Sequence, residues 1–186
     1  DACQAGCAQV AEAMGPVDIL VNNAGITRDG TLQRMTLDMW DDVIRINLGG
    51  CFNMAKAVFP AMKDRGWGRI VNIGSIQSFV HLRTPSSPAY TASKHGVLGF
   101  TKALAAELGK EGVRVNAIGP GFIATPLNAN ARATNPELVK TFLDHTPLGR
   151  AGTAEDIVGP AIFLASDLSA YVSGEIVMVD GGYRAV

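Results

Sequence analysis

A tyrosine and a lysine stand four residues apart in the stretch YTASK, as Tyr90 and Lys94. On a helix, residues at i and i+4 share a face, so both side chains can enter one cavity. A free tyrosine hydroxyl has a pKa near ~10, and a neighbouring positive charge favours its ionised form. The pair therefore has the chemistry of a general acid and base tuned toward neutral pH. The same spacing also occurs on ordinary solvated helix faces, so the pair needs supporting residues.

Two further polar residues stand at informative places. Ser75 ends the apolar stretch GRIVNIGS, fifteen residues before Tyr90. Its hydroxyl can hold a substrate oxygen beside the tyrosine. Asn47 lies inside a helical pattern, where an amide is unfavourable unless it is hydrogen-bonded. Each also has a plain structural interpretation, Ser75 as a turn residue and Asn47 as a satisfied core amide.

The elements that must position these residues alternate along the chain. Apolar runs predict strands, and apolar residues recurring at three and four predict helices with Thr36 as an N-cap. Pro160 predicts a kink or a late start in the last helix. Near-continuous apolar strands separated by helices indicate a parallel α/β sheet, doubly wound, with helices on both faces and residues 1–186 in one domain. The expected strands are 17–25, 68–75, 113–121 and 175–182, the expected helices are 1–15, 35–62, 90–109 and 153–167, and residues 124–152 form a polar excursion.

Such a sheet binds its ligand at the carboxyl ends of its strands. Small or polar residues stand there, at 22–25, 74–75 and 119–121. The Gly-rich turn of a dinucleotide fingerprint does not occur between a strand and a helix, and neither does the ribose-reading residue about 20 positions later. If the fold binds a dinucleotide, we expect the phosphate-and-adenosine half of the site to precede Asp1.

Composition excludes several other classes. The chain has 186 residues, 47% hydrophobic and 18% charged, with a net charge of −1 and no long run of one sign. A nucleic-acid or anionic-membrane surface is therefore not expected. No segment has the pattern of a membrane span or a signal peptide. Cys3, Cys7 and Cys51 lack the spacing of a metal site, and we expect reduced thiols in a cytoplasmic protein without a metal.

Together with the stretches NNAG, YTASK and NAIGPG, these residues match a family. The chain resembles the short-chain dehydrogenases/reductases from the helix before NNAG to the closing VDGG. The resemblance implies NAD(P)(H)-dependent hydride transfer between a carbonyl and a secondary alcohol. It makes Tyr90 the acid/base and Ser75 the group that orients the carbonyl. It implies that Lys94 binds the nicotinamide ribose and lowers the pKa of Tyr90. It also implies that the backbone of Asn47 holds a water molecule in a proton relay.

The same resemblance implies the cofactor contacts and the assembly. The family's first three strands and phosphate loop are not in this sequence, so the domain is expected to be N-terminally incomplete. The choice between NADP and NAD stays open, with NADP favoured by the reductase-like motifs. A homo-tetramer is expected through the helices at 35–62 and 90–109. The implied cofactor contacts are Asn22, Ala24, Gly25, Tyr90, Lys94, Pro120, Gly121, Ile123 and Thr125.

Within this resemblance two substrate classes are possible, and a further alternative is that the chain has no catalytic function. NNAGITRDG and RGWGRIVNIGS are most similar to 3-oxoacyl-carrier-protein and acetoacetyl-CoA reductases. Those enzymes usually place the serine and tyrosine thirteen apart rather than fifteen, and they tend to be basic where this chain has Glu111. The stretch from Thr125 to Gly152 and the ending VDGGYRAV resemble gluconate-type sugar and polyol dehydrogenases. His81, Arg83 and His145 are then either substrate contacts or exposed loop residues. The alternative of another class is a non-catalytic truncated fragment or interaction module.

Overall fold

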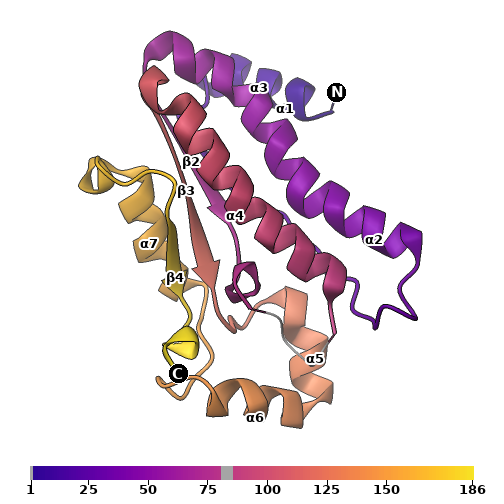
Figure 1. Ribbon diagram of the computed structural model, residues 1–186. Helices are drawn as coiled ribbons and strands as arrows, with labels where there is room; N and C mark the ends of the chain where they lie inside the picture. Colours follow the sequence, from indigo (N-terminus) through magenta and orange to yellow (C-terminus); the bar gives the residue numbers. More distant parts are fainter. Residues whose placement is uncertain (1, 81–85) are drawn as a thin grey trace.

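Four parallel strands lie in sequence order across one sheet in the computed structural model, which describes residues 2–80 and 86–186 (Figure 1). The pairing sets Leu20 beside Ile70, Val71 beside Asn116, and Ile118 beside Val177. The β-branched residues of these runs suit a pleated surface that is buried on both sides. The strands are β1 (Ile19–Asn22), β2 (Gly68–Ile73), β3 (Val113–Pro120) and β4 (Ile176–Val179).

One face of the sheet is covered by two long helical segments that lie side by side in Figure 1. The first consists of α2 (Leu37–Ile44), the π-helical turn η1 (Arg45–Gly49) and α3 (Gly50–Arg65). The second is α4 (Pro88–Leu108). Thr36 caps α2 as expected, with its Oγ1 accepting from the Met39 N–H at 3.2 Å. The core beneath these helices contains Leu20, Ala55, Val58, Met62, Ile70, Leu108, Val113 and Val115.

The opposite face carries α7 (Glu155–Ala165), which packs Leu164 against Val71 and Ile118. Ile70 faces the first helical layer and Val71 faces α7, as the two-residue period of a strand requires. Helices therefore cover both faces of a parallel sheet, which confirms the predicted fold class. Pro160 lies inside α7, five residues after its first residue.

The prediction was wrong for residues 124–152, which contain two helices rather than a polar excursion alone. These are α5 (Ala129–Thr134) and α6 (Pro136–Asp144). The Asn135 side chain accepts from the Leu138 N–H at 3.0 Å, and Pro136 takes the first helical position. An Asn-Pro helix start was therefore readable in the sequence. Leu138 and Phe142 of α6 pack against Ile76, which lies three residues after the end of β2.

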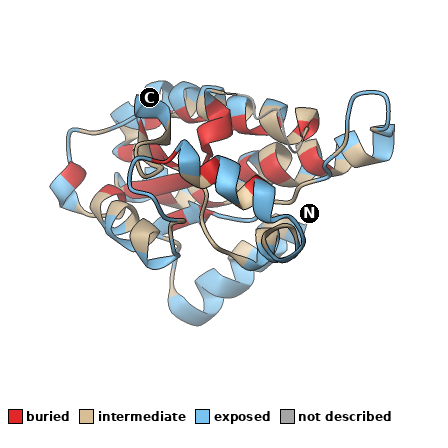
Figure 2. Cartoon of the chain, turned by 90° about the horizontal axis from the view of Figure 1, so that it is seen from below, coloured by how far each residue is buried: buried red, intermediate tan, exposed pale blue. Residues whose placement is uncertain are grey.

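The remaining elements are a terminal helix and short turns. Helix α1 (Ala2–Met14) contacts α3. Buried residues concentrate on the strands and the inner sides of the helices, as Figure 2 shows. Within residues 2–80 and 86–186, no helix is long and apolar enough to cross a membrane, and no three His, Cys, Asp or Glu side chains gather to hold a metal ion. The 3₁₀ turns are η2 (Ile76–Ser78), η3 (Gly109–Glu111), η4 (Pro126–Asn128), η5 (Asp167–Ser169) and η6 (Tyr183–Ala185).

Candidate active site

The carboxyl ends of β1, β2 and β3 bring the predicted site residues to one edge of the sheet. Asn23, Ala24 and Gly25 follow β1, Ser75 follows β2, and Gly121 follows β3. Helix α4 starts at the same edge, because a helix that connects parallel strands runs antiparallel to them. Tyr90 and Lys94 lie in its first two turns, so the topology alone brings them close to Ser75 (Figure 1).

Ser75 is held by a reciprocal cap on η2. Its Oγ accepts from the Gln77 N–H at 3.1 Å, and its own N–H donates to the Ser78 Oγ at 3.2 Å. The Ser78 hydroxyl in turn donates to the Lys94 carbonyl at 2.8 Å, which ties η2 to α4. The Ser75 oxygen accepts one hydrogen bond from the backbone, and its O–H remains available as a donor. The Ser75 hydroxyl interacts with Tyr90 and lowers the pKa of that phenol.

Tyr90 and Lys94 share a face of α4, as the spacing predicted. The Lys94 Nζ lies 5.4 Å from the centre of the Tyr90 ring and donates to the Ile73 carbonyl at 2.7 Å. Burial lowers the pKa of Lys94 to about 8, an effect that Cys51 opposes. Burial raises the pKa of Tyr90, the hydrogen bond with Ser75 lowers it, and Asp29 raises it.

The expected lowering of the tyrosine pKa by Lys94 is therefore not what this structure shows. The ammonium is directed at the Ile73 carbonyl, and the net effect on the pKa of Tyr90 is upward. The group that opposes the cost of burying the phenolate is the Ser75 hydroxyl. A hydrogen bond to the charged form of an acid favours that form, just as a nearby cation does.

Asn47 lies in the π-helical turn η1 and is almost fully buried. Its side chain accepts from the Ile26 N–H at 2.8 Å and donates to the Ile26 carbonyl at 3.0 Å. The same amide nitrogen donates to the Ser93 Oγ at 3.1 Å, and that hydroxyl donates to the Tyr90 carbonyl at 2.7 Å. The side chain is thus a satisfied core amide that joins the loop after β1 to α4. Its backbone carbonyl accepts from the Cys51 Sγ at 3.2 Å, so the proton-relay role stays a prediction.

Asn22 and Gly25 determine where the loop after β1 lies. The Asn22 side chain donates to the Asn72 Oδ1 at 2.8 Å, and Asn72 donates to the Thr101 Oγ1 at 2.9 Å. This buried chain of hydrogen bonds joins two strands to α4 and fixes the side chain of Asn22. At Gly25, the position of an added Cβ lies 3.4 Å from the Asn47 Oδ1 and 3.8 Å from the Lys94 Nζ. The loop therefore passes directly beside Lys94.

The predicted contacts after β3 lie next to the end of β4. The Gly121 N–H donates to the Val179 carbonyl at 2.9 Å, and a Cβ there would stand 2.7 Å from the Asp180 Cα, so only glycine fits. Ile123 pairs with Gly152, and Thr125 caps η4. A cavity of about 120 Å³ opens here, lined by Ile123 and Gly181 among others. None of Asn47, Ser75, Tyr90 and Lys94 lines this cavity.

Sequence reasoning missed the residues that hold the candidate site residues in place. Ser78 and Ser93 connect η2 and η1 to α4, and Gln77 contacts its first turn. The sequence signal for Ser78 was its position three residues after Ser75, which is the spacing of a helix capping box. His145 is exposed and contacts the Thr141 carbonyl, 2.9 Å away. His81 and Arg83 lie outside the described residues.

The chain matches a family model described as enoyl-(acyl carrier protein) reductase over residues 1–184. It is 44% identical to an acetoacetyl-CoA reductase of Shinella zoogloeoides over 184 residues, which cover 98% of this chain and 74% of that one. It is 45% identical to a 3-oxoacyl-acyl-carrier-protein reductase of Thermotoga maritima over 175 residues, 94% of this chain and 69% of the relative.

A solved structure extends the comparison to another substrate class. The crystal structure of a gluconate 5-dehydrogenase from Burkholderia cenocepacia, in complex with NADP and tartrate, superposes with a TM-score of 0.93 at 38% identity. The match covers 99% of this chain and 71% of the neighbour.

Proposed function

This chain belongs to the short-chain dehydrogenase/reductase family of oxidoreductases, and we propose that it interconverts a carbonyl group and a secondary alcohol with NADP or NAD as cofactor. The observation that carries this proposal is the convergence of Ser75, after β2, and Tyr90, in the first turn of α4, at the carboxyl ends of the strands, where Ser75 lowers the pKa of Tyr90. Lys94 lies one helical turn from the tyrosine.

The proposed residue roles follow from where charge develops. When bound, the nicotinamide ring supplies or accepts a hydride. Reduction leaves negative charge on the substrate oxygen, which the Ser75 hydroxyl stabilises as a donor. Tyr90 delivers a proton to the same oxygen. Both interactions are stronger in the transition state than with the neutral carbonyl, which is the condition for faster turnover.

The residues at this edge fit the nicotinamide-ribose part of a dinucleotide. An ammonium has three donors, and Lys94 uses one of them on the Ile73 carbonyl. The other two suit the paired hydroxyls of a ribose. The backbones of Asn22, Ala24 and Gly25 would line one side, and Pro120, Gly121, Ile123 and Thr125 the other. NADP is favoured because a structurally similar protein contains it.

A 3-oxoacyl thioester is the first candidate substrate. It is supported by the acetoacetyl-CoA and carrier-protein reductases among the relatives. Its reacting ketone stands two carbons from a thioester carbonyl, so one molecule offers two acceptor oxygens.

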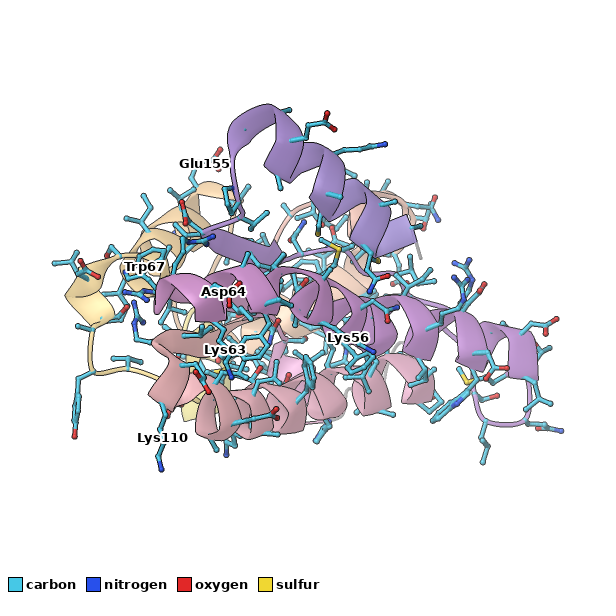
Figure 3. All side chains as sticks on the ribbon, turned by 90° about the horizontal axis from the view of Figure 1, so that it is seen from above. Lys56, Lys63, Asp64, Trp67, Lys110 and Glu155 are labelled. Carbon is cyan, nitrogen blue, oxygen red and sulfur yellow. The ribbon has the colours of Figure 1, made fainter. Side chains whose placement is uncertain are left out.

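A hydroxylated keto acid or polyol is the second candidate, and one local observation favours it. Glu111, which stands where carrier-protein reductases tend to be basic, forms an ion pair with Lys63 at 3.1 Å. Lys63 and Lys110 lie on the same side of the molecule as Glu111 (Figure 3). The surface around Glu111 therefore contains charges of both signs and is not uniformly basic. The similar gluconate dehydrogenase structure holds tartrate, a hydroxylated dicarboxylate.

Replacing Tyr90 by phenylalanine tests the proposal. Oxidation of NADPH and NADH is followed with acetoacetyl-CoA and with a keto sugar acid. We expect Tyr90→Phe to lose about 10²- to 10⁴-fold in kcat, the usual contribution of a positioned general acid. Tyr171→Phe, at a fully exposed tyrosine, is the matched control and should keep full activity. Wild-type turnover by a folded Tyr90→Phe variant would contradict the mechanism.

A further inference from the structure

Gln77 is a buried amide whose orientation is fixed by two hydroxyl groups. It lies in η2, two residues after Ser75, and only 8% of it is exposed. Its Oε1 accepts from the Ser87 Oγ at 3.1 Å and from the Thr91 Oγ1 at 2.6 Å. A distance of 2.6 Å belongs to O–H···O rather than N–H···O bonds, so the amide oxygen is the atom that faces α4.

The Ser87 hydroxyl bonds to this amide and does not form a helix-cap hydrogen bond. Ser87 is the N-cap residue of α4, yet its side chain makes no cap hydrogen bond. A serine cap typically contributes about 1 kcal/mol to helix stability. Thr36 and Asn135 do cap their helices in this chain. The Ser87 hydroxyl instead donates to the Gln77 Oε1, which fixes the direction of the amide.

The other end of the amide has no acceptor from the protein. Across residues 2–80 and 86–186, no acceptor lies within hydrogen-bonding distance of the Gln77 Nε2. Among the described residues, the buried side-chain atoms without a partner are the Nε atoms of Arg69 and Arg114, and the Gln77 Nε2 is not one of them. The two N–H donors of Gln77 therefore have no acceptor among the described residues and are the part of this side chain left for a ligand.

Gln77 is hydrogen-bonded to both segments that carry the proposed catalytic hydroxyls. Its backbone N–H donates to the Ser75 Oγ, and its side-chain Oε1 accepts from the hydroxyl of Thr91, the residue that follows Tyr90. A substrate whose carbonyl contacts Ser75 and Tyr90 would therefore lie close to Gln77. Because both hydroxyl contacts occupy the amide oxygen, only donors remain on this side chain.

We propose, on the basis of the function proposed above, that Gln77 determines substrate specificity by donating a hydrogen bond to a second oxygen of the substrate, close to the reacting carbonyl. The recognised atom is an acceptor: a hydroxyl or carboxylate oxygen of a keto sugar acid, or the thioester carbonyl of a 3-oxoacyl substrate. A simple ketone has no such oxygen and leaves the amide nitrogen unpaired on closure of the complex. Sites built to hydrogen-bond a substrate group discriminate strongly against analogues that lack it.

The test compares three probes under NADPH and NADH: 5-ketogluconate, acetoacetyl-CoA and cyclohexanone. The measured quantity is the preference, that is, kcat/KM for each oxygen-bearing probe divided by kcat/KM for cyclohexanone. We expect Gln77→Leu to lower this preference by about 10- to 100-fold, the range of one or two lost hydrogen bonds. The probe whose preference falls identifies the source of the second oxygen.

Two variants separate recognition from structure. Gln77→Glu keeps the shape and the two contacts with Ser87 and Thr91, but it replaces the donors by a carboxylate oxygen. We expect it to lower the preference at least as much as Gln77→Leu, most strongly for the keto acid. Gln9→Leu, at an exposed glutamine of α1, should leave the preference unchanged.

A purely structural role predicts a different result. If Gln77 only supports η2, its variants slow all three probes equally and the preference stays constant, which overturns this inference and leaves the proposed function intact. A wild-type enzyme that prefers cyclohexanone also overturns it. Absence of turnover by the wild type with every probe and both cofactors overturns the proposed function, and this inference with it.

Discussion

Burying Lys94 has an electrostatic cost, because its ammonium is removed from water and donates to the Ile73 carbonyl. Its pKa of about 8 lies below the ordinary value of 10.5. Below pH 8 the native and unfolded chains both hold the proton, and the full cost of burying the charge, about 3 kcal/mol, is present. Between pH 8 and 10.5 the unfolded chain binds more protons than the native one, so stability rises with pH in this window.

Lys94→Met removes this charge and tests the sign. The variant loses the hydrogen bond to Ile73, which costs about 1 kcal/mol, so we expect a net gain of about 1–2 kcal/mol at pH 7. The gain should shrink as the pH rises toward 10. Urea unfolding at both pH values measures it, with Lys102→Met, at an exposed lysine of the same helix, as the control. A gain that stays constant or grows with pH would refute a lowered pKa at Lys94.

At the scale of elements, two turns pack so closely that one of them must contain glycine. Gly66 ends α3, and Gly112 leads into β3 with a φ of +77°. A Cβ on Gly112 would stand 1.9 Å from the Gly66 carbonyl oxygen, so any side chain forces the backbone apart. Gly112→Ala should cost more than about 2 kcal/mol in unfolding free energy, combining clash and backbone strain. Gly6→Ala, in a helix with open space around it, should instead gain up to about 1 kcal/mol. Thermal and urea unfolding of both variants decide this, and a neutral Gly112→Ala would contradict the packing.

The same scale shows what sequence patterns could predict. All four strands and the long helices were predictable, because buried strands and amphipathic helices carry their periodicity locally. The π-helical turn around Asn47 was not, since it depends on contacts with Ile26 and Ser93, 21 and 46 residues away. Tyr90, Lys94 and Ser75 were found through residue type, spacing and motif. Gln77 was missed because its partners, Ser87 and Thr91, become neighbours only when η2 folds onto α4.

At the scale of the whole molecule, the outer side of the helical layer carries an aromatic pair that is partly exposed. Phe52 on α3 is 49% exposed and meets Phe100 on α4 edge-to-face, with ring centres 6.4 Å apart. The Lys56 Nζ lies 5.6 Å from the Phe52 ring centre, so the aliphatic part of the lysine side chain lies along the same surface (Figure 3). Both helices belong to the segments expected to form the tetramer, and large aromatic side chains are enriched in the centres of protein interfaces.

Phe52→Glu tests whether this aromatic surface joins copies of the chain. A charge at the centre of an apolar interface must be desolvated without a partner, so its introduction should shift the equilibrium toward smaller species. We expect size-exclusion chromatography with light scattering to show a lower mass for Phe52→Glu than for the wild type at equal concentration. Met14→Glu, at an 86% exposed residue of α1, introduces the same charge away from this surface and should keep the wild-type mass. Because Phe52 lies on the outer side of α3, its replacement leaves the core intact, and unchanged helical circular dichroism would show that any loss of mass reflects dissociation. A Phe52→Glu variant with the wild-type mass would place the interface elsewhere.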